Sequence, residues 1–296
     1  MPDTFSSFHP FVNFAFFTAV IGFSMFFMHP VFQAVSLICS VSYAIYLHGK
    51  KAFKTSLRFL LPMFIFAAVM SPLFNHRGAT ILTFLPNGNP ITLESILYGI
   101  AAAVMLITVI TWFSCFNAVI TSDKFVYIFG RIAPALSLIL SMALRLVPRF
   151  KAQLTHIANA QRGIGQGVSN GTVFQKARHG IKLISIMMTW ALENAIETAD
   201  SMKNRGYGLP KRTAFSIYTF TRRDGYALVY LFSCVATVIT GAVTGLYHFR
   251  YFPTVRGEWT GIGTVAVFAA YLALAAFPII INLKEDTLWK HIESKI

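Results

Sequence analysis

Six long apolar runs, separated by short polar segments, restrict this chain more than any other feature of its sequence. Each run is long enough, or nearly so, for a helix to cross the roughly 30 Å hydrocarbon core of a bilayer. Only 12% of the 296 residues are charged and 55% are hydrophobic, so polar groups cannot cover a soluble globular surface. The sequence therefore predicts an all-α, polytopic membrane protein with about six transmembrane helices, over residues 8–28, 31–47, 59–74, 96–120, 226–246 and 261–281.

The positive charge is concentrated in two segments between these runs. The net charge is +14, and residues 120–225 alone hold fifteen Lys or Arg against five Asp or Glu. Four further bases lie close together in residues 50–58. Cytoplasmic loops of membrane proteins carry such an excess of Lys and Arg, so the charge predicts that both segments are cytoplasmic and requires no nucleic-acid partner.

The apolar stretch 132–147 is a separate case, because it is short and contains Arg145. If it crossed the membrane, the most basic part of the chain would lie outside the cell, against the charge bias. We therefore interpret it as a helix that lies at the membrane interface or is covered by protein. The predicted division is N-terminal transmembrane helices in 1–121, a cytoplasmic and interfacial helical region in 122–222, and C-terminal transmembrane helices in 223–296.

Two long helices are predicted in the basic region. Pro148 suits a first helical turn, and the first helix runs from there to Gly163. The second runs from Ile181 to Arg205 and is about 37 Å long at 1.5 Å per residue. Its apolar positions alternate by three and four, as in the seam of packed long helices, and the predicted seam consists of Ile181, Ile184, Met188, Ala191, Ala195 and Met202.

Both helices are expected to end in the same pattern. Gln161-Arg162-Gly163-Ile164-Gly165 and Asn204-Arg205-Gly206-Tyr207-Gly208 each read amide, Arg, Gly, bulky apolar, Gly. A Gly after a helix end permits a left-handed cap, and an Arg in the last turn complements the helix dipole, so either motif alone is most simply an ordinary C-cap. The pair together predicts two equivalent docking tips, because an Arg at a helix end can bind a carboxylate or the carbonyls of a partner.

The stretch Ala199–Tyr207 closely resembles the second signature of the transmembrane T component of energy-coupling-factor (ECF) transporters, and residues 160–163 resemble its first signature. The order of elements is also similar over nearly the whole chain. In that family the two signatures lie at the ends of crossed coupling helices and dock into grooves on two ABC-type ATPase subunits. The resemblance therefore implies long crossed coupling helices whose docking residues are Ala160, Gln161, Arg162, Gly163, Asn204, Arg205, Gly206 and Tyr207.

The resemblance also implies a function. A T component transmits the ATP-driven movement of two ATPase subunits to a membrane-embedded, substrate-binding S component, for uptake of a vitamin or other micronutrient across the bacterial cell membrane. The apolar helix faces that S component, with Leu136, Leu140 and Leu144 as contacts. This chain departs from the family pattern at Gln161 and Asn204, where alanine is usual.

No cofactor and no enzymatic activity are expected on this chain, because the partner subunits would bind the ATP. In agreement, the sequence contains no G-x-x-x-x-G-K-[ST] phosphate-binding loop. The cysteines Cys39, Cys115 and Cys234 lie singly within apolar runs and the histidines are scattered, so we expect buried hydrophobic cysteines and no metal site.

Two other classes of function stay open at this point. A self-contained secondary transporter needs polar groups and broken helices at mid-membrane, which the runs lack apart from Pro62 and a few Ser and Thr residues. A membrane-embedded enzyme needs clustered acids or histidines, and only Glu193, Glu197 and Asp200 come close. We interpret those three acids as a solvated or salt-bridged face of the second helix.

Overall fold

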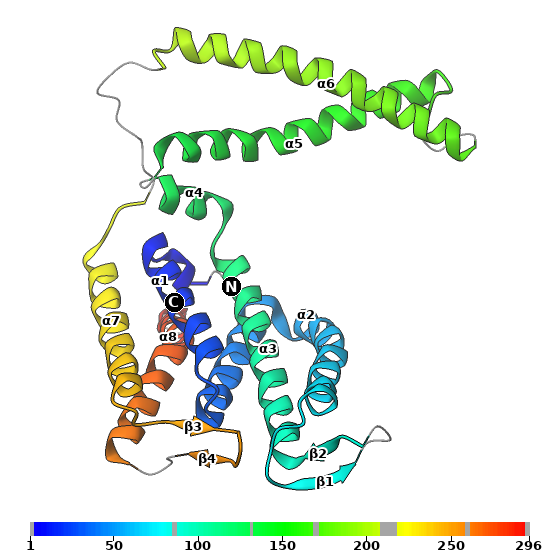
Figure 1. The fold of residues 1–296 in the computed structure, drawn as a ribbon. Coiled ribbons are helices and arrows are strands. Elements are labelled where there is room, and N and C mark those ends of the chain that lie inside the picture. The colour runs from blue at the N-terminus through cyan, green and yellow to red at the C-terminus, as the bar shows by residue number, and fades with distance from the viewer. Residues whose placement is uncertain are drawn as a thin grey trace. The chain divides into compact units, whose positions relative to one another are not determined.

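The computed structural model describes residues 3–84, 88–130, 133–167, 172–207, 218–257 and 261–293, with all of their side chains except those of 50–57, 134–136, 290 and 293. The chain forms two compact units. The first consists of Met1–Thr121 together with Tyr218–Ile296, and the second of Ser122–Ile217. Figure 1 shows the helices of both units.

The first unit is a bundle of long apolar helices with two small hairpins at one end (Figure 1). In chain order its elements are η1 (Phe5–Ser7), α1 (Pro10–Phe26), α2 (Pro30–Phe74), β1 (Ile81–Phe84), β2 (Pro90–Thr92), α3 (Leu93–Val119), α7 (Arg222–Val243), β3 (Phe249–Arg250), β4 (Arg256–Gly257) and α8 (Ile262–Glu293).

The lengths of these helices confirm the prediction of a multi-pass helical membrane protein. Four segments are long and apolar enough to cross a membrane, and two shorter apolar helices occupy the other two predicted positions. The long segments are Pro30–Gly49, Leu93–Val119, Arg222–Val243 and Ile262–Trp289, and the shorter ones are Pro10–Phe26 and Arg58–Phe74. The count of six spans stays a prediction.

Local sequence signals set the helix starts in the first unit. α1 and α2 each begin with a proline at the first helical position, where a missing N–H costs nothing, and a histidine precedes each of them. The side chains of His9 and His29 accept hydrogen bonds from the backbone N–H groups of Phe11 and Val31, at 3.3 and 3.2 Å. The tight turn expected between the first two runs thus contains the capped start of α2.

Four helices of the first unit meet at a buried network of hydrogen bonds. The Ser24 hydroxyl on α1 lies 2.7 Å from the Ser36 hydroxyl on α2 and 3.2 Å from the Tyr271 hydroxyl on α8. Trp112 on α3 donates its Nε1–H to Ser36 Oγ at 2.9 Å. All four side chains are buried, so water cannot satisfy their polar groups and the hydrogen bonds among them do so instead.

Asn282 on α8 holds the start of the chain against the same bundle. Its Oδ1 atom accepts hydrogen bonds from the backbone N–H groups of Thr4 and Phe5, at 3.0 and 3.2 Å. Its Nδ2 group donates to Asp3 Oδ1 at 2.6 Å, and the Tyr43 hydroxyl donates to the other oxygen of Asp3 at 2.9 Å. The buried amide therefore has partners on both of its polar atoms.

The Gly241-x-x-x-Gly245 pattern has two separate roles. A Cβ at Gly241 would lie 2.6 Å from Val267 Cγ2, so the missing side chain lets α7 pack closely against α8. Gly245 instead lies beyond the end of α7 with φ +73°. Only the first glycine of the pattern is thus a helix-packing position.

The strands were not expected from the sequence. β1 pairs with β2, and β3 with β4, each antiparallel. The first hairpin lies in the turn-rich segment 75–95, and Glu94 supports it by accepting hydrogen bonds from the backbone N–H and the hydroxyl of Thr80. Strands of two to four residues are too short to produce an alternating apolar pattern, so this part of the expectation was incomplete.

The described residues of the second unit form three helices, α4 (Ser122–Gly130), α5 (Pro134–Gly163) and α6 (Val173–Asn204). The predicted helix start at Pro148 is wrong, because α5 is continuous from Pro134 and contains Pro148 in its interior. Residues 134–147 of the apolar stretch and the first basic helix are therefore parts of one element. α6 begins eight residues before the predicted Ile181, where Thr172 and Gln175 form a capping box.

We expect Ser36→Ala to lower the stability of the first unit by about 1 kcal/mol, because the Trp112 N–H loses its acceptor in a place without water. The measurement is the midpoint of unfolding in a mixed-micelle denaturant titration. Ser42→Ala is the matched control on the same helix, since Ser42 is exposed and its hydroxyl donates to Ile38 O of its own helix. Equal midpoints for the two variants would contradict a stabilising role for the network.

Candidate functional site

The end of α5 is closed by a Schellman motif on the second glycine of its sequence pattern. Gly165 has φ +76°, and its N–H donates to Arg162 O at 3.0 Å. The N–H of Gln166 donates to Gln161 O at 2.9 Å, which completes the motif. Arg162 therefore lies inside the last helical turn, with an exposed side chain.

The end of α6 is closed by the same motif on the first glycine of its pattern. Gly206 has φ +81°, and its N–H donates to Lys203 O at 3.0 Å. The N–H of Tyr207 donates to Met202 O at 3.1 Å. Arg205 is here the cap residue itself, just beyond the last helical residue Asn204.

The two tips are therefore alike in sequence and in the type of cap, but the cap lies on a different glycine of the pattern. The left-handed cap of α5 lies at Gly165, because α5 includes Gly163 and the positive φ lies two residues later. Each motif offers two glycines, and the sequence does not say which one the helix uses. Gly208, the second glycine of the other motif, lies outside the described residues.

The remaining predicted docking residues are exposed or partly exposed. Ala160, Asn204, Arg205 and Tyr207 are exposed, whereas Gln161 and Gly206 are partly buried. The Oε1 atom of Gln161 is buried and has no hydrogen-bond partner among the described residues. Gln161, where alanine is usual in the resembling family, thus leaves one polar atom unsatisfied in the isolated chain.

The structure divides the predicted seam of α6 into two parts. Its first three residues face away from other described side chains, and Ile181 and Met188 are 69% and 64% exposed. Ile184 is exposed with them. Ala191, Ala195 and Met202 instead line a groove together with residues of α5.

Trp190 on α6 contacts two residues of α5. Its ring lies edge-on to Phe150, with ring centroids 5.4 Å apart. The Arg149 guanidinium lies 5.8 Å from the centroid of the Trp190 ring, at cation–π distance. Beside this contact the groove opens to a volume of about 870 Å³.

The predicted S-component contacts lie on the first half of α5. Leu140 and Leu144 are exposed, as are Ile139 and Val147 beside them. The side chain of Leu136 is outside the described residues. An exposed apolar face of this kind marks a surface that lipid or protein covers.

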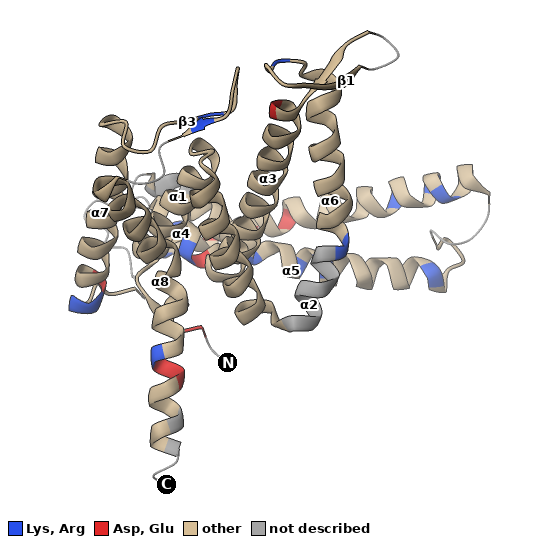
Figure 2. Ribbon diagram, turned by 90° about the horizontal axis from the view of Figure 1, so that it is seen from below, with Lys and Arg blue, Asp and Glu red and all other residues tan. Residues whose placement is uncertain are grey.

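Basic residues are distributed differently in the two units. Figure 2 shows Lys and Arg along α5 and α6, while the middle turns of α1, α3 and α7 carry none. The three cysteines are buried and unpaired, as expected. Within the described ranges, no three His, Cys, Asp or Glu side chains gather closely enough to bind a metal ion.

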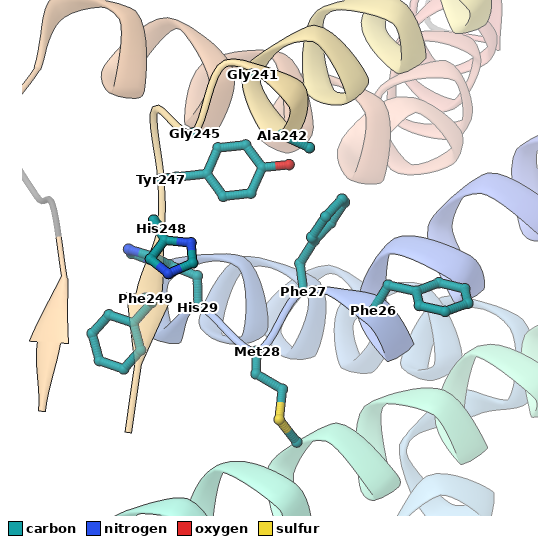
Figure 3. Close-up of a pocket in the computed structure, with 10 residues that line it drawn as sticks. All are labelled: Phe26, Phe27, Met28, His29, Gly241, Ala242, Gly245, Tyr247, His248 and Phe249. Atoms are coloured by element: carbon teal, nitrogen blue, oxygen red, sulfur yellow. The ribbon is translucent and has the colours of Figure 1, made fainter. Parts of the chain in front are cut away.

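A small pocket of about 210 Å³ lies in the first unit, where α1 leads into α2 and α7 ends. Figure 3 shows its lining, which is mostly aromatic and includes Phe27, Tyr247 and Phe249. The ring of His248 on its rim accepts a hydrogen bond from Arg250 Nε at 2.7 Å. No carboxylate or thiol is among the described lining residues, so this pocket offers no acid–base or nucleophilic pair.

Comparison with known proteins finds similarity over most of the chain. Residues 6–215 match the profile of the CbiQ family, described as cobalt transport protein. The chain is 38% identical over 93 residues to the energy-coupling factor transporter transmembrane protein EcfT of Lacticaseibacillus paracasei, which covers 31% of this chain and 35% of that protein. It is 29% identical over 175 residues to the protein of the same name from Streptococcus thermophilus, covering 56% and 66%.

A third relative with that name, from Brevibacillus brevis, is 31% identical over 107 residues, covering 36% of this chain and 40% of the relative. The aligned parts thus span less than two thirds of the length of each of these relatives. The family profile, in contrast, includes the whole of α5 and α6 with both Arg-Gly ends.

We expect Gly165→Ala to destabilise the end of α5 by about 1 kcal/mol, because an L side chain at φ +76° is strained. The backbone amides of residues 165 and 166 should then exchange with deuterium faster than in the wild type. Gly163→Ala is the matched control, since its added methyl meets no atom within 4 Å and alanine favours a helix. Faster exchange in the Gly163 variant than in the Gly165 variant would contradict this assignment of the cap.

Proposed function

This chain belongs to the CbiQ family, and we propose that it is the transmembrane coupling component of an energy-coupling-factor transporter. In this role it joins two ABC-type ATPase subunits to a membrane-embedded S component that binds the substrate, a vitamin or other micronutrient. The ATPases bind and hydrolyse ATP, and this chain carries out no chemistry of its own. It acts in the bacterial cell membrane, with α5 and α6 on the cytoplasmic side.

One observation carries the proposal. Two helices of the same basic unit each end in an exposed arginine beside a completed Schellman cap. A capped end leaves few backbone groups to satisfy, so the arginine side chain is free to bind a partner. Its planar guanidinium suits a carboxylate or the carbonyls at the end of a partner helix.

The two long helices would transmit movement because each is stiff along its length. α6 has 32 residues and is about 48 Å long at 1.5 Å per residue. α5 and α6 touch at the Phe150–Trp190 contact, so a displacement of either tip changes how the helices lie at their far ends. Packed helices transmit such a displacement because their hydrogen bonds and side-chain contacts resist bending.

The exposed apolar residues supply surfaces for the S component. On α5 these are the predicted contacts Leu136, Leu140 and Leu144, of which the last two are exposed. On α6, Ile181, Ile184 and Met188 form a second exposed apolar face. Neither face is covered by described residues of this chain, which supports a role for both in binding a hydrophobic partner.

We expect the combined variant Arg162→Ala with Arg205→Ala to lose copurification of the ATPase subunits while the chain still inserts into the membrane. Each removed guanidinium leaves a partner group unpaired, at a cost of about 2–5 kcal/mol of docking free energy. The matched control removes two other exposed bases of α5 and α6, Lys151→Ala with Lys176→Ala. The proposal fails if the arginine variant retains both ATPases, or if the purified chain alone catalyses ion-driven uptake.

We also expect Gly163→Leu to weaken ATPase copurification without opening the α5 cap. Gly163 is helical and has open space around it, so a larger side chain there meets nothing in this chain and would obstruct only a closely approaching partner. Deuterium exchange at residues 165 and 166 serves as the check on the cap. Undiminished copurification with an intact cap would show that the partner does not approach this side of α5.

A further inference from the structure

Three arginines line the groove between α5 and α6. Arg145 and Arg149 lie one turn apart on α5, and Arg205 lines the groove from the end of α6. Glu197 is the one carboxylate among the described lining residues, so the groove carries a net charge of about +2. Such a surface binds an anion, and the planar guanidinium is well suited to the oxygens of a phosphate.

The rest of the groove is largely apolar. Its lining includes Met142, Leu146 and Phe150 from α5 and Met202 from α6. Asn194 also lines it and is only 8% exposed, with no hydrogen-bond partner for its Nδ2 group among the described residues. The groove thus combines an apolar floor, three cations and one unsatisfied buried donor.

The apolar floor continues onto the outside of α5. Leu140 and Leu144 are exposed on the same part of α5 as the groove residues Met142 and Arg145. In a membrane protein, an amphipathic helix with exposed leucines and neighbouring arginines is typical of a segment that lies at the lipid headgroups. Lipid therefore has access to the groove along α5 itself.

We propose that the groove binds an anionic phospholipid. The phosphate lies between Arg145 and Arg149, and an acyl chain lies over Met142, Leu146 and Phe150. Basic pockets between helices at the inner membrane surface bind acidic headgroups in this way. The bound lipid would hold α5 and α6 apart at a fixed separation beside their Trp190 contact. The inference does not depend on the ATPase-docking role, because Arg145 and Arg149 take no part in that docking.

The test measures phosphatidylglycerol binding to the purified full chain by native mass spectrometry in mild detergent. Phosphatidylcholine of the same chain length tests the need for negative charge, and glycerol phosphate tests whether a free phosphate suffices. Arg145→Gln with Arg149→Gln should weaken phosphatidylglycerol binding about thirtyfold, at roughly fivefold for each basic residue. The control Lys151→Gln with Lys176→Gln removes the same charge from exposed positions outside the groove and should bind as the wild type does.

Ala195→Phe provides a second variant that keeps every charge and fills the groove, and it should also weaken phosphatidylglycerol binding. Circular dichroism and gel filtration verify that each variant is folded. Equal loss in the lysine control, equal binding of phosphatidylcholine, or equally tight binding of glycerol phosphate would each overturn the proposal. So would an arginine variant that keeps the lipid and loses a protein partner, because the groove would then be a protein-docking site.

Discussion

An apolar helix gains little by leaving lipid for another helix, so the first unit depends on buried hydrogen bonds and on close backbone contacts. The bonds among Ser24, Ser36, Trp112 and Tyr271 join four helices at one point. Gly241 brings α7 against α8, and Asn282 ties the start of the chain to α8. These contacts hold the helices of the first unit together.

The second unit has a different construction. Phe150 of α5 and Trp190 of α6 are in contact, and much of the apolar surface of both helices is exposed. A unit held by few contacts can change its arrangement at low cost, and a unit with exposed apolar faces requires partners. Both properties suit a component that transmits movement between other subunits, and the arginine-lined groove adds a place where lipid could regulate that movement.

The sequence predicted best those features that a strong physical constraint sets. Bilayer thickness fixes the length of an apolar run, so the positions of the membrane helices were predictable. Pro148 misled because an interior proline can be accommodated within a long helix. The capping glycine of α5 was not predictable, because Gly163 and Gly165 both follow Arg162 closely in the sequence. The seam of α6 was only partly predictable, because periodicity identifies an apolar face without saying whether this chain or a partner covers it.

The different caps have a geometric consequence for the two arginines. Arg162 lies three residues before its left-handed glycine, and Arg205 one residue before its own. A shift of two residues corresponds to about 200° of rotation around an α-helix and about 3 Å along it. Measured from their caps, the two side chains thus leave on nearly opposite sides. Two identical partner subunits would therefore have to bind the two helix ends in different rotational orientations.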